Sequence, residues 1–170
     1  DGYQTGGGTA FVEWIIHERP SVTPIAPSTS PSPAWTDPIR QLAFNHWLEG
    51  LASAHGLQPA SLRVASADAS FRRYLRIDST LPGVGSRIVM DAPPDKEDCK
   101  PFAKVAALTA QAGLQAPEIL AWDEAQGFML LSDLGGSTLL STLEVDAPDA
   151  PGNRARYAAA IDELLRLQAV

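Results

Sequence analysis

The order of short apolar runs between residues 36 and 132 constrains the fold most. Five runs are typical of β-strands, at residues 62–66, 71–77, 87–91, 119–122 and 128–131. Leu81-Pro82-Gly83 predicts a turn between the second and third runs. Short connections favour antiparallel pairing, and a helix is expected to cross the sheet before the last two strands complete it. The pattern therefore predicts an α+β fold with a five-stranded antiparallel sheet, not alternating parallel units.

Helices are predicted on either side of these strands. Asp37 precedes Pro38, which suits the first position of a helix, and Gly56 is a natural stop signal. The apolar residues at helical spacing in this first helix are Ile39, Leu42, Ala43, Trp47, Leu48 and Leu51. A second helix is expected over about residues 101–113 and a short one over residues 138–143.

The two ends of the chain have different expectations. Residues 1–34 are predicted to be a disordered extension or linker, because their proline-, serine- and threonine-rich stretch cannot form a core. Gly6-Gly7-Gly8 lacks the Gly-Lys-Ser/Thr of a phosphate loop. The last helix is expected to have Asn153 as its N-cap. Its predicted buried stripe consists of Tyr157, Ile161, Leu164, Leu165 and Gln168.

The composition argues against several functional classes. A formal net charge of −7 and a pI of about 4.8 disfavour electrostatic binding to nucleic acid. Cys99 is the single cysteine, so no internal disulfide is possible, which fits a reducing compartment. No apolar run reaches the length of a membrane span, and no basic and apolar leader begins the sequence. The expectation is a cytoplasmic protein without nucleic-acid or membrane partners.

Four motifs occur in a defined order along the chain. They are Ala67-Asp68-Ala69-Ser70-Phe71-Arg72-Arg73-Tyr74, Met90-Asp91-Ala92-Pro93-Pro94, Glu97-Asp98-Cys99-Lys100-Pro101-Phe102 and Gly127-Phe128-Met129-Leu130-Leu131-Ser132-Asp133-Leu134-Gly135. With the element order, they resemble the aminoglycoside phosphotransferase family of protein-kinase-like enzymes. The resemblance implies a kinase-like small lobe over residues 35–134. It also implies that residues 135–170 form the hinge and the first helices of a truncated large lobe.

The same resemblance implies a chemical activity. The family transfers a phosphoryl group from ATP with Mg²⁺ to a small-molecule alcohol. The implied acceptor is the anomeric hydroxyl of an amino sugar, N-acetylmuramate or N-acetylglucosamine, in cell-wall recycling. The implied partners are therefore ATP and a small sugar substrate.

The resemblance places Asp68, Ala69 and Ser70 in the loop that covers the ATP phosphates. Small residues let backbone N–H groups approach an anion, and the Ser70 hydroxyl is an additional contact. Arg72 and Arg73 follow at once, and strand alternation points them to opposite faces. One of the two is therefore expected to grip phosphate oxygens. The alternative is a tight turn followed by a solvent-exposed arginine pair.

The third strand departs from the usual kinase pattern. Kinase-like folds commonly carry a lysine there, paired with a glutamate on the crossing helix. The corresponding residue here is Met90, which has no charge, and the adjacent Asp91 has the wrong sign. Either one of the two arginines takes over the cationic role, or ATP is held differently. Glu97 and Asp98 are candidates for the pairing acid, and the alternative is that they stabilise a helix start through its dipole.

Ser132, Asp133 and Leu134 correspond to the hinge between the two lobes. A hinge binds adenine mainly through backbone donors and acceptors, so these three residues are predicted to contact the nucleotide. The alternative is a strand that ends in a turn. Met129 and Leu130 are expected to be core residues rather than adenine contacts.

The catalytic residues that the resemblance implies are not found in this sequence. The family uses a His-x-Asp-x-x-x-x-Asn loop and a later aspartate that holds Mg²⁺, whereas no histidine follows His55. No catalytic or metal-binding residue is therefore predicted, and the chain alone is predicted to be inactive. The alternative function is a noncatalytic nucleotide-binding or adaptor module of the same fold. A third interpretation is an α+β interaction domain that binds no nucleotide.

Overall fold

The computed structural model describes residues 33–67 and 71–169. Within them the chain divides into two compact units, one of residues 33–67, 71–99 and 118–133 and one of residues 100–117 and 134–169. The first unit contains the sheet and the helix that precedes it in the sequence. The second unit contains the later helices. The predicted extension at residues 1–34 lies almost entirely outside the described residues.

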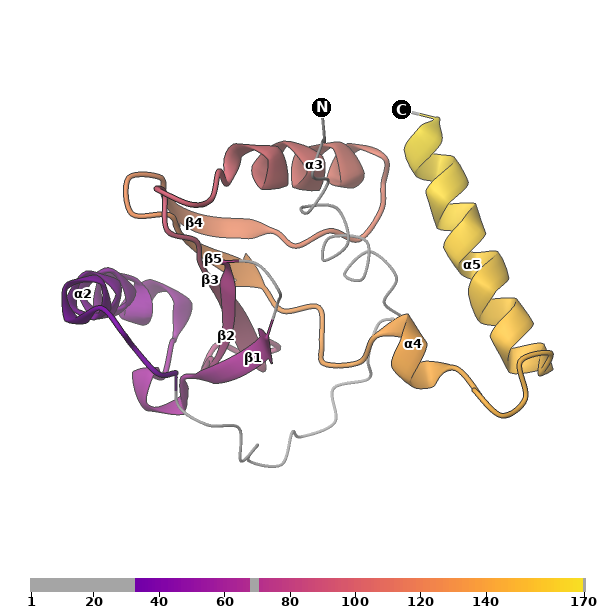
Figure 1. Cartoon of the computed structure of the whole chain (residues 1–170), viewed down its shortest axis with the longest axis horizontal. Coiled ribbons are helices and arrows are strands. Elements are labelled where there is room, and N and C mark those ends of the chain that lie inside the picture. The colour runs from indigo at the N-terminus through magenta and orange to yellow at the C-terminus, as the bar shows by residue number, and fades with distance from the viewer. Residues whose placement is uncertain (1–32, 68–70, 170) are drawn as a thin grey trace. The chain divides into compact units, whose positions relative to one another are not determined.

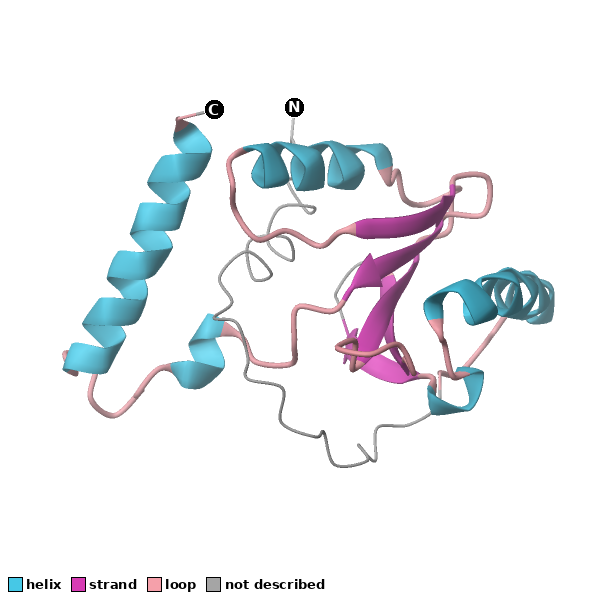
Figure 2. Ribbon diagram, turned by 180° about the vertical axis from the view of Figure 1, so that it is seen from behind, coloured by secondary structure: helices cyan, strands magenta, loops and turns pink. Residues whose placement is uncertain are grey.

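Five strands form one sheet, and every neighbouring pair is antiparallel (Figures 1 and 2). The strands are β1 (Arg63–Ala67), β2 (Arg73–Asp78), β3 (Ser86–Asp91), β4 (Ile119–Asp123) and β5 (Phe128–Ser132), in the spatial order β1-β2-β3-β5-β4. β2 pairs with β3 along its whole length, from Arg73 opposite Asp91 to Asp78 opposite Ser86. The predicted five-stranded antiparallel sheet of an α+β fold is confirmed.

Helix α2 (Pro38–His55) begins and ends where the local signals predict. The Asp37 carboxylate accepts two backbone N–H groups of the first turn, at 2.9 and 3.2 Å. At the other end, Gly56 adopts the left-handed conformation with φ of 61°. A Cβ at Gly56 would also lie 2.8 Å from the Thr80 hydroxyl oxygen, so both conformation and space favour glycine.

Helix α2 packs on one face of the sheet, and this contact forms the core of the first unit (Figure 2). The buried side chains that meet there come from α2, β2, β3 and β5 and include Phe44, Leu48, Leu75, Ile77, Val89, Phe128 and Leu130. The Phe44 ring meets Phe128 edge-on, with centroids 5.4 Å apart. We call this side of the sheet the α2 face and the other side the opposite face.

Three large apolar residues of the predicted helical and strand patterns in this unit are exposed. Ile39 and Leu42 belong to the predicted apolar stripe of α2 but are 81% and 71% exposed, because the side of the helix that meets the sheet carries Phe44 instead. Phe71 precedes β2 and is 61% exposed, so it does not join the buried side chains of that strand. Apolar residues at helical spacing were not all buried, because the sheet covers only part of the surface of α2.

The second unit contains α3 (Lys100–Gln111), α4 (Leu139–Thr142) and α5 (Pro151–Gln168). Thr138 caps α4 by accepting the backbone N–H of Ser141. Asn153 is not the N-cap of α5, which is a correction to the predicted helix start. It lies in the first turn of α5, where its buried side chain bonds the backbone of the preceding loop, including both backbone groups of Glu144.

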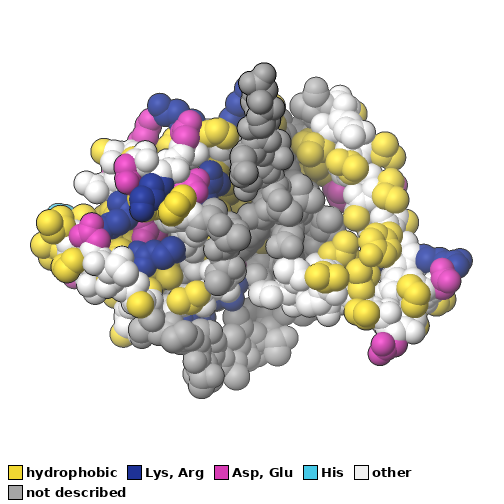
Figure 3. Space-filling model, viewed as in Figure 1, with side chains coloured by type: hydrophobic (Ala, Val, Ile, Leu, Met, Phe, Trp, Pro, Cys, Tyr) yellow, Lys and Arg dark blue, Asp and Glu magenta, His cyan; other side chains and the backbone are white. Residues whose placement is uncertain are grey.

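The predicted buried stripe of α5 is also exposed. Its large apolar members, Tyr157, Ile161, Leu164 and Leu165, are 51–59% exposed, and Figure 3 shows hydrophobic side chains along this helix. Apolar spacing thus identified the helix and its amphipathic side without indicating what that side contacts. Within residues 33–67 and 71–169, none of the helices has both the length and the hydropathy needed to cross a bilayer.

Candidate functional site

Strand β2 sends charged side chains to both faces of the sheet. Leu75 lies in the core beneath α2, so Arg73, which shares its alternation, lies on the α2 face. Tyr74 and Arg76 therefore project on the opposite face. Arg72 directly precedes the strand and interacts with the Tyr74 side chain, which places Arg72 on the opposite face too. The side chains of Arg72 and Arg73 consequently lie on different sides of the sheet.

Arg73 belongs to a buried charge cluster on the α2 face. The Asp91 side chain is 1% exposed, and its two oxygens accept from Nε of Arg73 and Nε of Arg40, each at 2.9 Å. The Arg73 guanidinium also stacks 4.0 Å from the Trp35 ring centroid, while Arg40 lies 4.6 Å from that of Phe128. Two cations thus neutralise one carboxylate and join α2 to β2 and β3. These partners give Arg73 a structural role.

Arg72 is held by the segment that follows β3. Its Nε donates to a Glu97 carboxylate oxygen at 2.9 Å, and a terminal nitrogen donates to the Asp98 carbonyl at 3.2 Å. Burial lowers the pKa of Arg72, but interactions with Tyr74 and Glu97 raise it by more, so the net pKa lies above its ordinary value. The guanidinium therefore stays charged in a partly buried position.

The ion pair with Arg72 identifies a partner for Glu97. Glu97 lies three residues before α3 begins, and the first turn of α3 contains no acidic residue. Nearby, Met90 is fully buried and pairs with Tyr74 across the β2–β3 ladder. Asp91 turns to the α2 face, so neither of these two β3 residues places a charge on the opposite face. This arrangement favours the ion-pair interpretation of Glu97 over the helix-dipole interpretation.

The predicted phosphate loop is described only through its flanking residues. Its members Asp68, Ala69 and Ser70 lie outside the described residues. Beyond the loop, the Lys96 ammonium lies 4.9 Å from the centroid of the Phe71 ring. The start of β2 and the segment after β3 therefore lie side by side. Two cations, Arg72 and Lys96, come together at this corner of the sheet.

At the other end of β2, the predicted hinge is tied to the sheet through Asp133. Its carboxylate accepts from Arg76 through two nitrogens, at 2.6 and 3.0 Å, and from the Ser86 hydroxyl at 2.6 Å. The Asp133 side chain is consequently buried between β2 and β3. Sequence reasoning missed Arg76 and Ser86. The available signal was that Arg76 alternates with the apolar Leu75, which marks it as pointing away from the core.

The remaining hinge residues are held by the backbone and by burial. The Ser132 hydroxyl accepts the backbone N–H of Glu118 at 2.8 Å, and the Ser132 N–H donates to the Glu118 carbonyl at 2.9 Å. Leu134 is buried. The chain passes from the first compact unit to the second between Asp133 and Leu134. Met129 and Leu130 are fully buried, as predicted for core residues.

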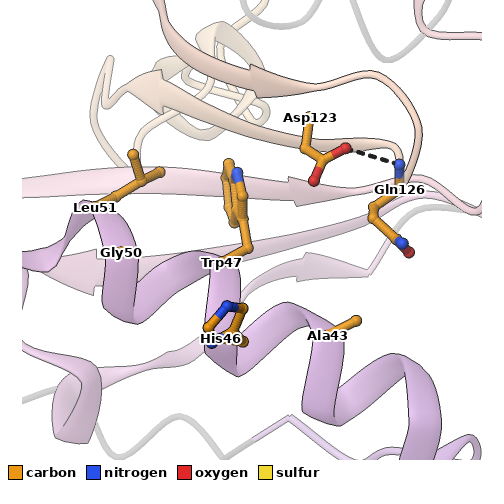
Figure 4. Close-up of a pocket in the computed structure, with 7 residues that line it drawn as sticks. All are labelled: Ala43, His46, Trp47, Gly50, Leu51, Asp123 and Gln126. Atoms are coloured by element: carbon orange, nitrogen blue, oxygen red, sulfur yellow. Dashed lines mark hydrogen bonds between the residues drawn. The ribbon is translucent and has the colours of Figure 1, made fainter.

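A shallow pocket of about 460 Å³ lies between α2 and the turn after β4 (Figure 4). It is lined by Ala43, His46, Trp47, Gly50, Leu51, Asp123 and Gln126. Its lining contains no lysine or arginine, and one Asp123 oxygen already accepts the backbone N–H of Gln126 at 3.0 Å. Its lining residues therefore offer no lysine or arginine to a phosphate group. In the part of the chain that the structure describes, no acidic, histidine or cysteine cluster is arranged to bind a metal ion.

Comparison with known proteins gives a consistent family match. Residues 61–170 match the family model described as "Phosphotransferase enzyme family". Three curated relatives are N-acetylmuramate/N-acetylglucosamine kinases. That of Pseudomonas aeruginosa is 46% identical over 79% of this chain and 40% of its own length. The enzyme of Pseudomonas putida is 45% identical over 68% of this chain and 32% of its own length. The enzyme of Neisseria meningitidis serogroup B is 35% identical over 76% of this chain and 36% of its own length. The chain thus spans two fifths or less of these relatives.

Proposed function

Because this chain belongs to the phosphotransferase enzyme family, we propose that it supplies the nucleotide-binding part of an ATP-dependent kinase. The observation that carries the proposal is the arrangement along β2. One end presents Arg72, which is held by Glu97 and follows the predicted phosphate loop in the sequence. Four residues further on, Arg76 holds Asp133 of the predicted hinge. At roughly 3.3 Å per strand residue, the two ends lie about 13 Å apart on one face.

This spacing suits an extended nucleotide better than a compact ligand. The adenine would lie toward the hinge, where backbone groups of residues 132–134 are its expected partners. The phosphates would lie toward Arg72, whose fork of N–H donors matches phosphate oxygens. The opposite face of β2 would thus bind both ends of ATP. Asp68, Ala69 and Ser70 remain the proposed loop over the phosphates, with their backbone N–H groups as donors.

The acceptor that we propose is the anomeric hydroxyl of an amino sugar, N-acetylmuramate or N-acetylglucosamine. This part rests on the names of the relatives, which share 34–46% identity with the chain. Magnesium would neutralise charge on the transferred phosphoryl group when bound. We propose that this chain binds the nucleotide, and we assign it no metal ligands. The cytoplasm is the proposed location, because it supplies ATP.

A noncatalytic nucleotide-binding module is the second candidate function. No histidine follows His55 in the given residues, so they contain no His-x-Asp-x-x-x-x-Asn loop. We therefore propose that the isolated chain binds ATP without transferring its phosphoryl group. The two candidates differ in whether the intact gene product turns over substrate.

The test is a disruption of the gene that encodes this chain in its source cell. Extracts of the parent cells are expected to convert N-acetylmuramate or N-acetylglucosamine to a 1-phosphate with ATP. Extracts of the disrupted strain should lose that activity, and a plasmid copy of the gene should restore it. Unchanged sugar phosphorylation after disruption would contradict the kinase proposal. Chromatography with radiolabelled ATP measures the product directly.

A further inference from the structure

The opposite face of the sheet needs a cation where β3 does not provide one. A kinase-like site places a positive charge against the nucleotide phosphates, and a carboxylate holds that charge in place. On β3, Met90 is apolar and fully buried, and Asp91 is turned to the α2 face between Arg40 and Arg73. A cation for the phosphates must therefore come from another part of the sheet.

Arg72 meets the geometric requirement. Met90 lies directly opposite Tyr74 on the neighbouring strand, and Arg72 is two residues from Tyr74 and interacts with its side chain. At roughly 3.3 Å per residue, Arg72 therefore lies only about 7 Å along the sheet from the Met90 position and on the same face. The positive charge is therefore supplied just before β2 and not by the Met90 position of β3.

Glu97 completes the pair. Its carboxylate accepts from Arg72 Nε at 2.9 Å, and both side chains are largely withdrawn from solvent, with 16% and 15% exposed. A long arginine side chain has many rotamers, and a fixed carboxylate removes that freedom before a ligand arrives. The Asp98 carbonyl holds the same guanidinium from a second direction. The Arg72 guanidinium therefore has a fixed orientation before a ligand binds.

The other nearby cations fit less well. Arg73 lies on the α2 face and is bound to the buried Asp91. Lys96 is an exposed residue, and its ammonium lies 4.9 Å from the centroid of the Phe71 ring. An exposed lysine contributes weakly to phosphate affinity because water and salt screen its charge. Arg72 combines partial burial, a fixed orientation and the correct face.

We propose that Arg72 is the cation that binds the nucleotide phosphates and that Glu97 is its positioning residue, so that this pair replaces a strand lysine and its glutamate. The proposal rests on the proposed nucleotide-binding function. It assigns phosphate binding to Arg72 and not to the adjacent Arg73. It also predicts that the contribution of Arg72 depends on the number of phosphate groups in the ligand.

The test compares ligands that differ only in their phosphates. The chain is titrated with a fluorescent ATP analogue, which is then displaced with ATP, ADP, AMP and adenosine. In Arg72→Met, the affinity for ATP and ADP is expected to fall about 10- to 100-fold, the range for hydrogen bonds to charged groups. Adenosine affinity is expected to stay within about twofold of the unchanged chain. Glu97→Gln should produce a smaller loss of the same kind.

Two further variants separate ligand binding from folding. Arg73→Met removes the neighbouring cation and should lower the melting temperature, while the ratio of ATP to adenosine affinity stays unchanged. The double variant Arg72→Met/Glu97→Met replaces the ion pair by apolar side chains, which often preserves stability. If the pair is only structural, this double variant will bind ATP normally.

Three results would overturn the proposal. An unchanged ATP-to-adenosine ratio in Arg72→Met would assign the phosphates to another residue while the nucleotide-binding function stands. Normal ATP affinity in the stable double variant would do the same. No displacement by any nucleotide in the unchanged, folded chain would refute the nucleotide-binding function itself and the role of Arg72 with it.

Discussion

Arg40 and Asp91 are 51 residues apart in the sequence, yet Nε of Arg40 lies 2.9 Å from a carboxylate oxygen of Asp91. Arg73 binds the other oxygen of the same carboxylate. Arg40 also donates to the Gln126 carbonyl at 2.9 Å, so the cluster links α2 to three parts of the sheet unit. The nearly complete burial of Asp91 makes this cluster a central support of the α2 face.

Replacing Asp91 by Asn should strongly destabilise the chain. The change leaves two guanidinium groups without their shared negative charge, and breaking a buried pair in this way is expected to lower the free energy of unfolding by about 2–4 kcal/mol. The value lies toward the low end of such losses because the Arg73 side chain is 35% exposed. Urea unfolding followed by tryptophan fluorescence measures it.

A matched control is available in an exposed ion pair. Arg154 and Asp149 pair at 3.3 Å with side chains that are 72% and 92% exposed. Asp149→Asn should therefore change the free energy of unfolding by less than about 0.5 kcal/mol. Equal effects of the two substitutions would show that the Asp91 cluster contributes no more than a surface pair.

Gly127 should tolerate no side chain. Its φ is 70°, and a Cβ there would lie 1.9 Å from the Ala92 carbonyl oxygen, whose residue also donates its backbone N–H to Gly127. The neighbouring backbone would have to move, so Gly127→Ala is expected to lower the free energy of unfolding by about 3 kcal/mol or more in total. About 1–2 kcal/mol of this loss is the cost of an alanine in the left-handed backbone conformation. Thermal unfolding by circular dichroism measures the loss.

Gly83→Ala separates the two causes. Gly83 has φ of 75°, similar to Gly127, but no atom lies within 4 Å of the position that its Cβ would take. This variant should lose only the conformational part, about 1–2 kcal/mol. A loss at Gly83 as large as that at Gly127 would assign the whole effect to backbone conformation and none to the contact with Ala92.

Cys99 should react slowly with thiol reagents in the folded chain. Burial raises the pKa of its thiol, with nearby acids adding to the effect and Arg72 opposing it. Because the folded pKa exceeds the unfolded value of about 8.5, the contribution to stability is present below the unfolded pKa and is lost as the pH rises from there through the folded pKa. Near pH about 8.5, thiol modification should be slower than in urea, because the buried thiol is less ionised and less accessible.

The measurement is simple because Cys99 is the single cysteine of the chain. A coloured thiol reagent reports its rate of modification, and urea-unfolded chain serves as the reference. The same chain should also lose stability between about pH 8 and pH 10, where the unfolded thiol ionises. Equal modification rates with and without urea would contradict the buried position of the thiol.

Local signals predicted most of the fold. Asp37 and Gly56 mark the ends of α2 because capping depends on residues within one turn. The antiparallel pairing of the first three strands followed from their short connections, whereas the position of β5 between β3 and β4 was not predicted. The exposed Ile39 and the buried Phe44 were not distinguished, because their burial depends on how far the sheet extends beneath the helix. Asn153 likewise has a capping residue type but bonds a preceding loop.

The candidate site was predictable only in part. Alternation correctly separated Arg72 from Arg73, but the sequence alone did not indicate which one faces α2. That assignment depends on Asp91 and Arg40, which come together only in the folded unit. The link between Arg76 and the hinge was equally hidden, because it joins residues 57 positions apart. Long-range ion pairs therefore determine which side chains meet at the candidate site, whereas short-range sequence patterns determine where the helices and strands form.

The most direct measurement is hydrogen–deuterium exchange of the chain with and without saturating ATP. Slower exchange is predicted in peptides that cover residues 68–76 and 131–135, because the nucleotide is expected along the opposite face of β2. Exchange in α2 and around the pocket near Trp47 should not change. Protection confined to the α2 face, or no protection anywhere at saturating ATP, would contradict nucleotide binding at this site.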